Sequence, residues 1–182
     1  MRVGNHRYLL DVGVTNNARP SPTIPIDVRT EKPADHDGIS TVIEAAFEQP
    51  DEARLVVALR NEGLLIASSV ALADGQVVGH AALSAATIDS TPIMVLAPVA
   101  VLPSFQGRGV GTSVVRHVLE EAGEATVTVL GDPAYYRRFG FESAELYGVV
   151  DTFSTQPGAS QILRPQGTSG GTITYARPFY DL

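Results

Sequence analysis

Apolar residues recur at the spacing of an amphipathic helix in three segments of the chain. The first covers residues 33–47, where Pro33 suits the opening turn because its missing N–H would have no partner there. The second follows Pro50 and is predicted to end near Gly63. The third covers residues 109–122, and its apolar stripe consists of Val110, Val114, Val115, Val118, Leu119 and Ala122.

Other segments carry the patterns of β-strands. Residues 66–73 and 76–88 flank the turn dipeptide Asp74-Gly75, which predicts a hairpin. Residues 93–101, IMVLAPVAV, are almost wholly apolar, as expected of a central strand that is covered on both faces. Shorter strands are predicted at residues 26–30, 126–130 and 171–175, and a short helix at residues 133–139.

Helices and strands alternate without an internal repeat. The chain is therefore predicted to form one α+β domain over residues 26–182, with a mixed central β-sheet flanked by helices. Residues 1–25 contain several prolines and asparagines and no sustained periodicity, so they are expected to form a flexible N-terminal extension.

Composition narrows the class of protein. Hydrophobic residues make up 44% and charged residues 18%, which is typical of a globular domain. The absence of cysteine excludes disulfides, thiolate metal sites and cysteine nucleophiles, and it agrees with a reducing compartment. We expect no metal site, no membrane span and a cytoplasmic location.

The net charge of −7 makes a large polyanionic ligand implausible. Such a chain would repel the phosphate backbone of a nucleic acid, so no nucleic-acid partner is expected. One basic cluster stands in the middle of the chain, and we assign it to a smaller phosphate ligand; its members are Arg108, Arg116, Arg137 and Arg138.

The sharpest motif joins the apolar strand at residues 93–101 to the helix at residues 109–122. Its glycines, Gly107, Gly109 and Gly111, let the backbone turn sharply and approach a ligand closely. The first N–H groups of a helix have no internal partners, and with the helix dipole they form a site for an anion such as a diphosphate. Arg108 can add a charge-assisted hydrogen bond.

Two other glycine-rich loops fit less well. A Walker loop needs a lysine, but the only lysine of the chain is Lys32. A dinucleotide-binding loop needs GxGxxG, whereas this loop reads GRGVG. A glycine-rich turn with no ligand is the remaining alternative.

Two stretches resemble the GNAT superfamily of N-acetyltransferases. The segment PVAVLPSFQGRGVGTSVVRHVL looks like the acetyl-CoA signature Q/R-x-x-G-x-G/A, which matches Gln106, Gly109 and Gly111. Downstream, LGDPAYYRRFGF resembles the superfamily's YxxxGF ending, and with VVGHAALS it is similar to the YhbS-like branch of predicted acetyltransferases. The resemblance covers roughly residues 26–182.

The resemblance implies a GNAT-like domain whose splayed central strands bind acetyl-CoA. It implies that the strand backbone at Val99, Ala100 and Val101 pairs with the pantetheine arm, and that Tyr136 is the general acid. It further implies a loop that holds the diphosphate of CoA, formed by Gln106, Gly107, Arg108, Gly109, Val110, Gly111 and Thr112.

Pro98 agrees with this interpretation on physical grounds. A proline inside a central strand cannot donate to the ladder, so a bulge or splay is expected there, and it would free neighbouring amides for an extended ligand. A simple kink that ends one half of the strand is compatible with the same residue.

Acyl transfer needs a proton donor for the thiolate and a neutral amine. Tyr135 and Tyr136 point about 100° apart on a helix, so only one can face the sulfur; we choose Tyr136, with a purely structural role for both as the alternative. His80 is the candidate base, although a lone strand histidine is more often structural. Asp132 is a weaker base candidate, because it can cap the following helix.

Two roles are possible for the remaining basic residues. Arg137 and Arg138 could reach the 3′-phosphate of CoA or lie solvated, and His117 is expected to be structural. The leading hypothesis is an acetyl-CoA-dependent N-acetyltransferase acting on a primary amine by direct attack in a ternary complex. A non-catalytic acyl-CoA sensor is the alternative. The absence of a lysine from the glycine-rich loop argues against a third interpretation, a nucleotide-phosphate enzyme. The acceptor and the oligomeric state stay open, with a homodimer among the options.

Overall fold

A computed structural model describes residues 25–165, 167 and 170–181. The predicted N-terminal extension, apart from Pro25, lies outside the described residues. The other predicted elements can be compared directly with the structure.

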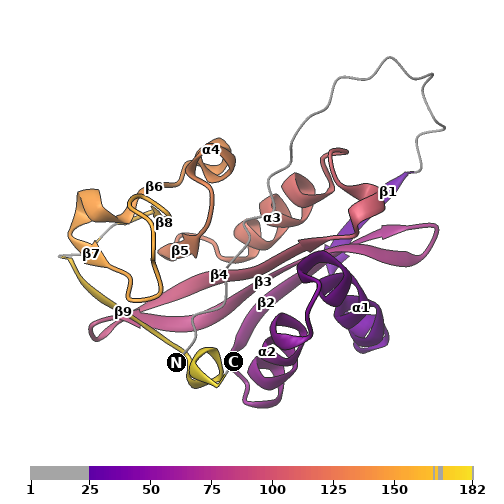
Figure 1. The fold of residues 1–182 in the computed structure, drawn as a ribbon, viewed down its shortest axis with the longest axis horizontal. Helices are drawn as coiled ribbons and strands as arrows, with labels where there is room; N and C mark the ends of the chain where they lie inside the picture. Colours follow the sequence, from indigo (N-terminus) through magenta and orange to yellow (C-terminus); the bar gives the residue numbers. More distant parts are fainter. Residues whose placement is uncertain (1–24, 166, 168–169, 182) are drawn as a thin grey trace.

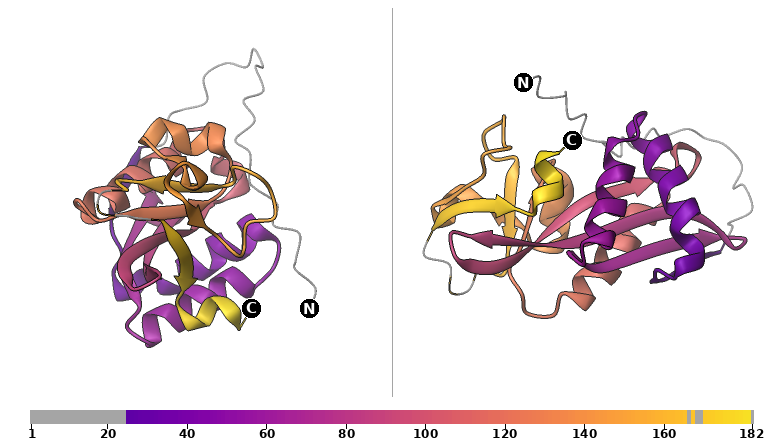
Figure 2. Two further views of the ribbon diagram at one scale, coloured as in Figure 1. Left: turned by 90° about the vertical axis from the view of Figure 1, so that its left-hand side faces the viewer. Right: turned by 90° about the horizontal axis from the view of Figure 1, so that it is seen from below.

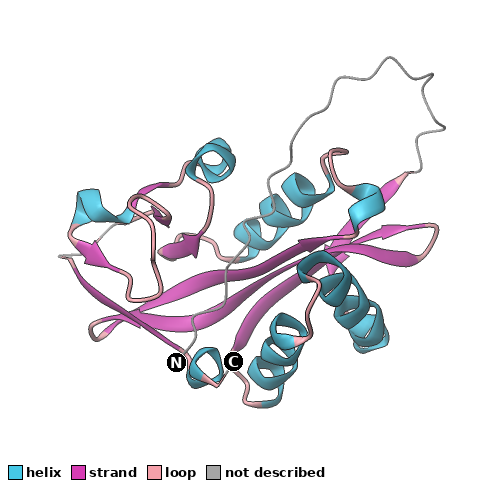
Figure 3. Cartoon of the chain, viewed as in Figure 1, coloured by secondary structure: helices cyan, strands magenta, loops and turns pink. Residues whose placement is uncertain are grey.

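A twisted mixed sheet forms the centre of the molecule (Figures 1 and 3). Its strands follow the order β1-β2-β3-β4-β5-β8-β6, and neighbours are antiparallel except for β4 and β5, which are parallel. These strands are β1 (Ile26–Thr30), β2 (Leu65–Ala73), β3 (Gln76–Ile88), β4 (Thr91–Val101), β5 (Val127–Leu130), β8 (Ser160–Leu163) and β6 (Glu142–Ser143). The far end of β3 also pairs with β9 (Gly171–Tyr175), which in turn pairs with β7 (Val149–Val150).

Helices cover both faces of this sheet (Figure 1). On one face lie α1 (His36–Phe47) and α2 (Asp51–Asn61), which run side by side in Figure 2, right. On the opposite face lies α3 (Val110–Glu121), with α4 (Pro133–Tyr136) above the gap between β4 and β5. The predicted α+β domain with a mixed, helix-flanked sheet is confirmed.

The apolar stripes explain this arrangement. All six stripe positions of α3 are buried in a cluster with the facing residues of β2, β3, β4 and β5. The buried side chains of α1, including Ile39 and Ile43, pack with Val70, Leu72 and Ala100 on the other face. A stripe that is removed from water on one side only fixes which side of the sheet each helix occupies.

The predicted hairpin and strands, and the helices after Pro50 and at residues 109–122, are found within one or two residues of their expected ends. The helix expected from Pro33 begins as the 3-10 turn Pro33–Asp35, and α1 starts at His36. The short helix at residues 133–139 divides into α4 and the 3-10 turn Arg137–Phe139, and Gly140 ends it in the left-handed region at φ 90. Sequence analysis missed β6, β7 and β8, because two-residue strands and the four residues of β8 are too short to show a period.

A bulge interrupts β4 at the proline. Leu96 pairs with Leu83 and Val99 pairs with Ala81, so two residues of β4, Ala97 and Pro98, stand opposite one residue of β3. On its other edge β4 pairs with β5 only at Met94 and Val95. Beyond Val95 the two parallel strands separate, and we call this gap the splay. The expected bulge and splay are both confirmed.

Candidate functional site

The loop between β4 and α3 presents the start of a helix without a side-chain cap. Gly107 and Gly109 have φ values of 71 and 82, which L side chains rarely adopt, and Gly109 is the N-cap of α3. The first N–H of the helix to find a backbone partner is that of Ser113, 3.0 Å from the Gly109 oxygen. The donors of Val110, Gly111 and Thr112 therefore form a site of positive potential suited to an anion.

Side chains hold the loop against the strand. Gln106 donates through Nε2 to the Val101 carbonyl oxygen at 3.1 Å, so it ties the loop back to the end of β4. Arg108 is exposed and lies over the ring of Phe105, 5.4 Å from its centroid. An anion at the start of α3 would thus find an exposed guanidinium beside it.

Gly111 allows Tyr135 and Val101 to pack closely against the start of α3. A Cβ built there would lie 2.9 Å from the hydroxyl oxygen of Tyr135 and 3.4 Å from Val101 Cγ2. The hydroxyl of Tyr135 therefore stands over the first turn of α3, which brings α4 against the loop between β4 and α3.

The backbone of β4 beside the splay alternates in direction. Leu102 N–H donates to the Val78 oxygen of β3, and N–H groups point to alternate sides along an antiparallel strand. The N–H groups of Val99 and Val101 consequently point into the splay, whereas the backbone of Ala100 faces β3, where Ala100 pairs with His80. Of the three residues assigned to pantetheine, two present their donors to the gap.

The two adjacent tyrosines diverge as their helical spacing predicts. Their rings meet edge to face at 5.0 Å, with Tyr135 over α3 and Tyr136 packed on Phe141. The ring of Tyr136 lies against the backbone of Gly131, because a Cβ there would come within 2.4 Å of its Cε2 atom. Burial, with smaller effects of Tyr135 and Asp132, raises the pKa of Tyr136 well above its usual value. Its hydroxyl stays protonated, as a proton donor requires.

His80 lies in a buried polar network on the face covered by α1 and α2. Its Nε2 is 2.9 Å from Ser68 Oγ, and Ser68 Oγ is 2.5 Å from Glu31 Oε2. Because the Glu31 carboxylate can only accept, Ser68 donates to it and accepts from His80 Nε2–H. Nδ1 is then the unprotonated nitrogen, and it has no hydrogen-bond partner among the described residues.

His36 Nε2 lies 3.6 Å from Glu31 Oε1, and the guanidinium of Arg60 extends this network. Its Nε and Nη2 each donate to Glu31 at 3.0 Å. Burial alone would raise the pKa of Glu31, but the hydrogen bonds from Arg60 and Ser68 outweigh it and lower that pKa below its usual value. Burial lowers the pKa of His80 to about 4, so the imidazole is neutral at pH 7. With no exposed surface, His80 shows the contacts of a structural residue.

Four further candidates are placed by their contacts. Asp132 accepts from the Ala134 N–H at 2.9 Å, as an N-cap does. His117 is 2.8 Å from Ser69 Oγ and joins α3 to β2. Arg138 donates to the Tyr135 carbonyl oxygen at 2.9 Å and lies over its ring, while Arg137 is exposed. Sequence analysis did not single out Glu31 or Arg60, because no local spacing signals a contact made across 29 residues.

Within the described ranges, no group of three His, Cys, Asp or Glu side chains could hold a metal ion. No helix in the part of the chain that the structure describes is long and apolar enough to cross a membrane.

Known proteins resemble this chain in sequence and in fold. Residues 60–143 match the acetyltransferase (GNAT) domain model. The Escherichia coli K12 protein named uncharacterized N-acetyltransferase YhbS is 40% identical over 123 residues, which are 64% of this chain and 74% of YhbS.

Two crystal structures match over nearly their full length. Escherichia coli YhbS in complex with CoA has a TM-score of 0.81 and 32% identity, covering 90% of this chain and 96% of that one. A GNAT acetyltransferase of Brucella melitensis in complex with acetyl-CoA has a TM-score of 0.72 and 34% identity, covering 86% and 99%. The predicted family is confirmed by sequence, by fold and by the arrangement of loop and splay: the chain belongs to the GNAT family of N-acetyltransferases.

Proposed function

We propose that this protein moves an acetyl group from acetyl-CoA to a primary amine by direct attack in a ternary complex. One observation carries the proposal: β4 parts from β5 beyond Val95, and the loop at the end of β4 presents the uncapped start of α3. An extended ligand with a diphosphate at one end and a thioester at the other fits such a gap. The CoA and acetyl-CoA complexes of the two similar proteins support this choice.

The residues of the loop fit a diphosphate. Gly109 leaves the space beside it empty, since a Cβ there would meet nothing within 4 Å. The N–H groups of residues 110–112 supply donors, and Arg108 supplies a cation. We assign the loop from Gln106 to Thr112 to the diphosphate of CoA.

We assign the strand backbone beside the splay to pantetheine and the thioester. The N–H groups of Val99 and Val101 point into the gap, where one of them can stabilise the negative charge that develops on the carbonyl oxygen. As the amine nitrogen bonds to the acyl carbon, the C–S bond breaks and the thiolate takes a proton. We assign that proton to the Tyr136 hydroxyl, which its raised pKa keeps protonated.

His80 remains the proposed base for the proton that the amine loses. Its neutral state and the free lone pair on Nδ1 support this role. Its complete burial means that a water molecule must carry the proton to it. A purely structural His80, with water alone as the acceptor, is the competing assignment.

We also propose a cytoplasmic location, where acetyl-CoA is available and where a chain without cysteine needs no oxidising compartment. The partner is an amine of small-molecule or peptide class, with no role for nucleic acid. A homodimer is compatible with this function.

Two measurements test the proposal. Acetyl-CoA at a hundredfold excess over its dissociation constant should stabilise the fold by about 2.7 kcal/mol, which a thermal melt detects. Release of free thiol with a panel of primary amines should show turnover. A melt that millimolar acetyl-CoA leaves unchanged would refute the proposal, whereas binding without turnover of any amine would favour an acyl-CoA sensor.

A further inference from the structure

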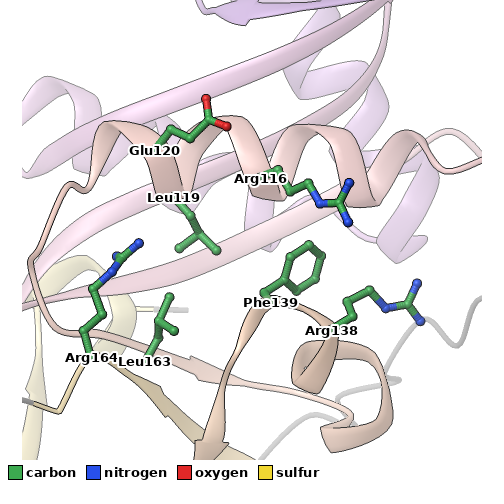
Figure 4. Close-up of a pocket in the computed structure, with 7 residues that line it drawn as sticks. All are labelled: Arg116, Leu119, Glu120, Arg138, Phe139, Leu163 and Arg164. Carbon is green, nitrogen blue, oxygen red and sulfur yellow. The ribbon is translucent and has the colours of Figure 1, made fainter.

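The side of the sheet that carries α3 is unsuited to the acceptor amine. A cavity of about 290 Å³ lies there beside α3, and it is lined by one glutamate, Glu120, and by Arg116, Arg138 and Arg164 (Figure 4). Arg116 and Arg164 form no ion pair with any described residue. An alkylamine has a pKa of about 10, so it arrives as a cation and these arginines repel it. The acceptor is therefore expected on the opposite face of the sheet.

Two buried hydroxyls mark the closed end of the splay on that opposite face. Ser84 of β3 pairs with Val95 of β4, and Val95 pairs with Thr128 of β5, so the three side chains form one row across the sheet. The row faces away from α3, because the alternate residues Leu83 and Val127 pack beneath that helix. Ser84 and Thr128 are 0% and 1% exposed, and neither hydroxyl has a hydrogen-bond partner among the described residues. A buried polar group without a partner is costly, so this row is suited to a ligand with a polar head.

Acetyl-CoA in its proposed position brings its acyl group to this row. The diphosphate lies at the loop after Val101, and the pantetheine follows β4 back toward Val95, where the splay closes. The thioester is then at the end of the splay that Ser84 and Thr128 flank. An amine that binds beside these two hydroxyls therefore lies next to the acyl carbon.

An aromatic cluster lies on the same face, where the C-terminal 3-10 turn Arg177–Tyr180 sits beside α2 (Figure 1). The cluster consists of Phe153, Tyr175, Phe179 and Tyr180. Its carboxylate, Asp151, accepts from the Tyr175 hydroxyl at 2.8 Å and from the Phe153 N–H at 2.9 Å. With 8% exposure and two donors already bound, Asp151 fixes the rings and offers little to a second ammonium group. What the cluster presents to a ligand is aromatic surface, since Tyr180 is 48% exposed.

The register of the strands places this cluster near the two hydroxyls. Tyr175 of β9 pairs with Ala86, which lies two residues from Ser84 on the same face of β3. Tyr175 and Val95 belong to one buried group, against which Phe153 packs. At about 4.8 Å between neighbouring strands, β9 lies roughly 10 Å from β4. The arm of a small amine spans that distance, from the aromatic surface to the closed end of the splay.

We propose that the acceptor is a primary amine with an aromatic arm, bound on the face of α1 and α2. The arm packs on the rings of Phe153 and Tyr180. The neutral amine donates to the hydroxyl oxygens of Ser84 and Thr128, which leaves its lone pair for the acyl carbon. The C–N bond forms and the C–S bond breaks as in the proposed function, with one amine proton passing to the base and the thiolate protonated by Tyr136. The inference rests on that function and adds the class of acceptor.

The first test compares 2-phenylethylamine with ethylamine and 1,4-diaminobutane as acceptors at saturating acetyl-CoA. The aromatic arm should raise kcat/KM about ten- to a hundredfold over both other amines, as expected from burial of one phenyl group. Calorimetry on the complex with CoA, which has no acyl group to transfer, should show the same order of affinities. Equal or faster turnover of ethylamine or 1,4-diaminobutane would overturn the aromatic class while leaving acetyl transfer intact. Binding of 2-phenylethylamine to the CoA complex without turnover of any amine would refute the proposed function but support this site.

Single variants test the two parts of the site. Thr128→Val replaces the hydroxyl by a methyl group, so it should lower kcat/KM about three- to tenfold for every amine that is turned over, with unchanged acetyl-CoA affinity and no loss of thermal stability. Tyr180→Leu removes an exposed ring and should lower kcat/KM about three- to tenfold for 2-phenylethylamine but not for ethylamine. Thr174→Val, at an exposed threonine of β9, is the control and should leave both amines unchanged. Kinetics that Thr128→Val or Tyr180→Leu leaves unchanged would overturn the assignment of that residue to the acceptor.

Discussion

Two groups of polar side chains, one on each face of the sheet, differ in whether their charged groups have partners. On the face of α1 and α2, Glu31 accepts three hydrogen bonds, two from Arg60 and one from Ser68, in a network that continues to His80. On the face of α3, the first amides of the helix and the guanidinium of Arg116 have no partner among the described residues. Both faces carry a packed apolar core, so burial alone does not separate them.

This difference indicates which polar groups are available for a ligand. A closed network satisfies its own charges and stabilises the fold. Donors without partners are tolerated at the surface because water solvates them, and an anionic ligand can replace that water. The group on the α3 face should therefore determine CoA affinity, whereas the network on the α1 and α2 face should determine stability.

The largest expected effect is on the α3 face, at Gly109. Gly109→Asp places a carboxylate beside the expected diphosphate, and two like charges about 4 Å apart cost about 4 kcal/mol at an effective dielectric constant of 20. CoA affinity, measured by calorimetry, should fall roughly a thousandfold. The fold should survive, because a Cβ at Gly109 meets nothing within 4 Å and Asp tolerates positive φ.

Gly109→Asn is the matched control, since it has nearly the same shape without the charge. It should lose much less affinity than the aspartate variant. If the folded aspartate variant binds CoA as wild type does, the phosphate site lies elsewhere.

The next effect concerns Tyr136, also on the α3 side. Tyr136→Phe removes the hydroxyl and leaves the ring against Gly131, so packing and CoA affinity should barely change. The turnover number should fall by about ten- to a thousandfold if proton transfer limits the rate.

Tyr135→Phe changes the neighbouring ring and serves as the comparison. Its hydroxyl stands over Gly111, so it should affect CoA affinity and leave turnover within about threefold. Equal turnover of wild type and Tyr136→Phe would show that water or another group protonates the thiolate.

On the opposite face, breaking the network should cost stability. Arg60→Met keeps the aliphatic stem but leaves the Glu31 carboxylate without its cation. Removing one partner of a fully buried pair costs about 3–5 kcal/mol, and because these side chains keep 20% and 13% exposure we expect about 2 kcal/mol in urea unfolding.

Arg54→Met breaks an exposed pair with Asp51, where the arginine side chain is 74% exposed. It should change the free energy of unfolding by less than about 0.5 kcal/mol. Similar losses of unfolding free energy in Arg60→Met and Arg54→Met would contradict the expectation that the partly buried network stabilises the fold more than an exposed ion pair does.

The smallest effect is a dependence of stability on pH at His80. Its pKa is lowered to about 4 in the fold from 6.5 when unfolded, so the unfolded chain binds more protons between these values. The stability contributed by neutral His80 is therefore complete above pH 6.5 and is lost as the pH falls toward 4.

Between pH 7 and pH 5.5 this loss should be about 1 kcal/mol in urea unfolding. His80→Gln should remove that part of the slope. His36→Gln, at a partly exposed histidine, should keep it. If wild type and His80→Gln lose stability equally over this range, His80 is not buried as the neutral form.

Much of the fold follows from local pattern. The stripe of α3, the Asp74-Gly75 hairpin and the apolar β4 are decided by residues close in sequence, so periodicity and turn chemistry predict them. Pro98 predicts the bulge for the same reason, since the missing N–H is a property of that residue alone. The glycine loop and the YxxxGF ending likewise indicate the family within short windows.

Only the tertiary structure decided which polar side chains contact one another. The bonds from Arg60 and Ser68 to Glu31 span 29 and 37 residues. Tyr135 reaches Gly111 although the rest of α3 and the whole of β5 lie between them in the sequence. The cavity of Arg116, Arg138 and Arg164 likewise draws on three separate elements. A side chain's pKa and its freedom to bind a ligand depend on neighbours that the path of the whole chain supplies. The sequence alone therefore determined the helices, the strands and the glycine-rich loop. The packing on the sheet's two faces determined which charged groups have partners within the fold and which do not.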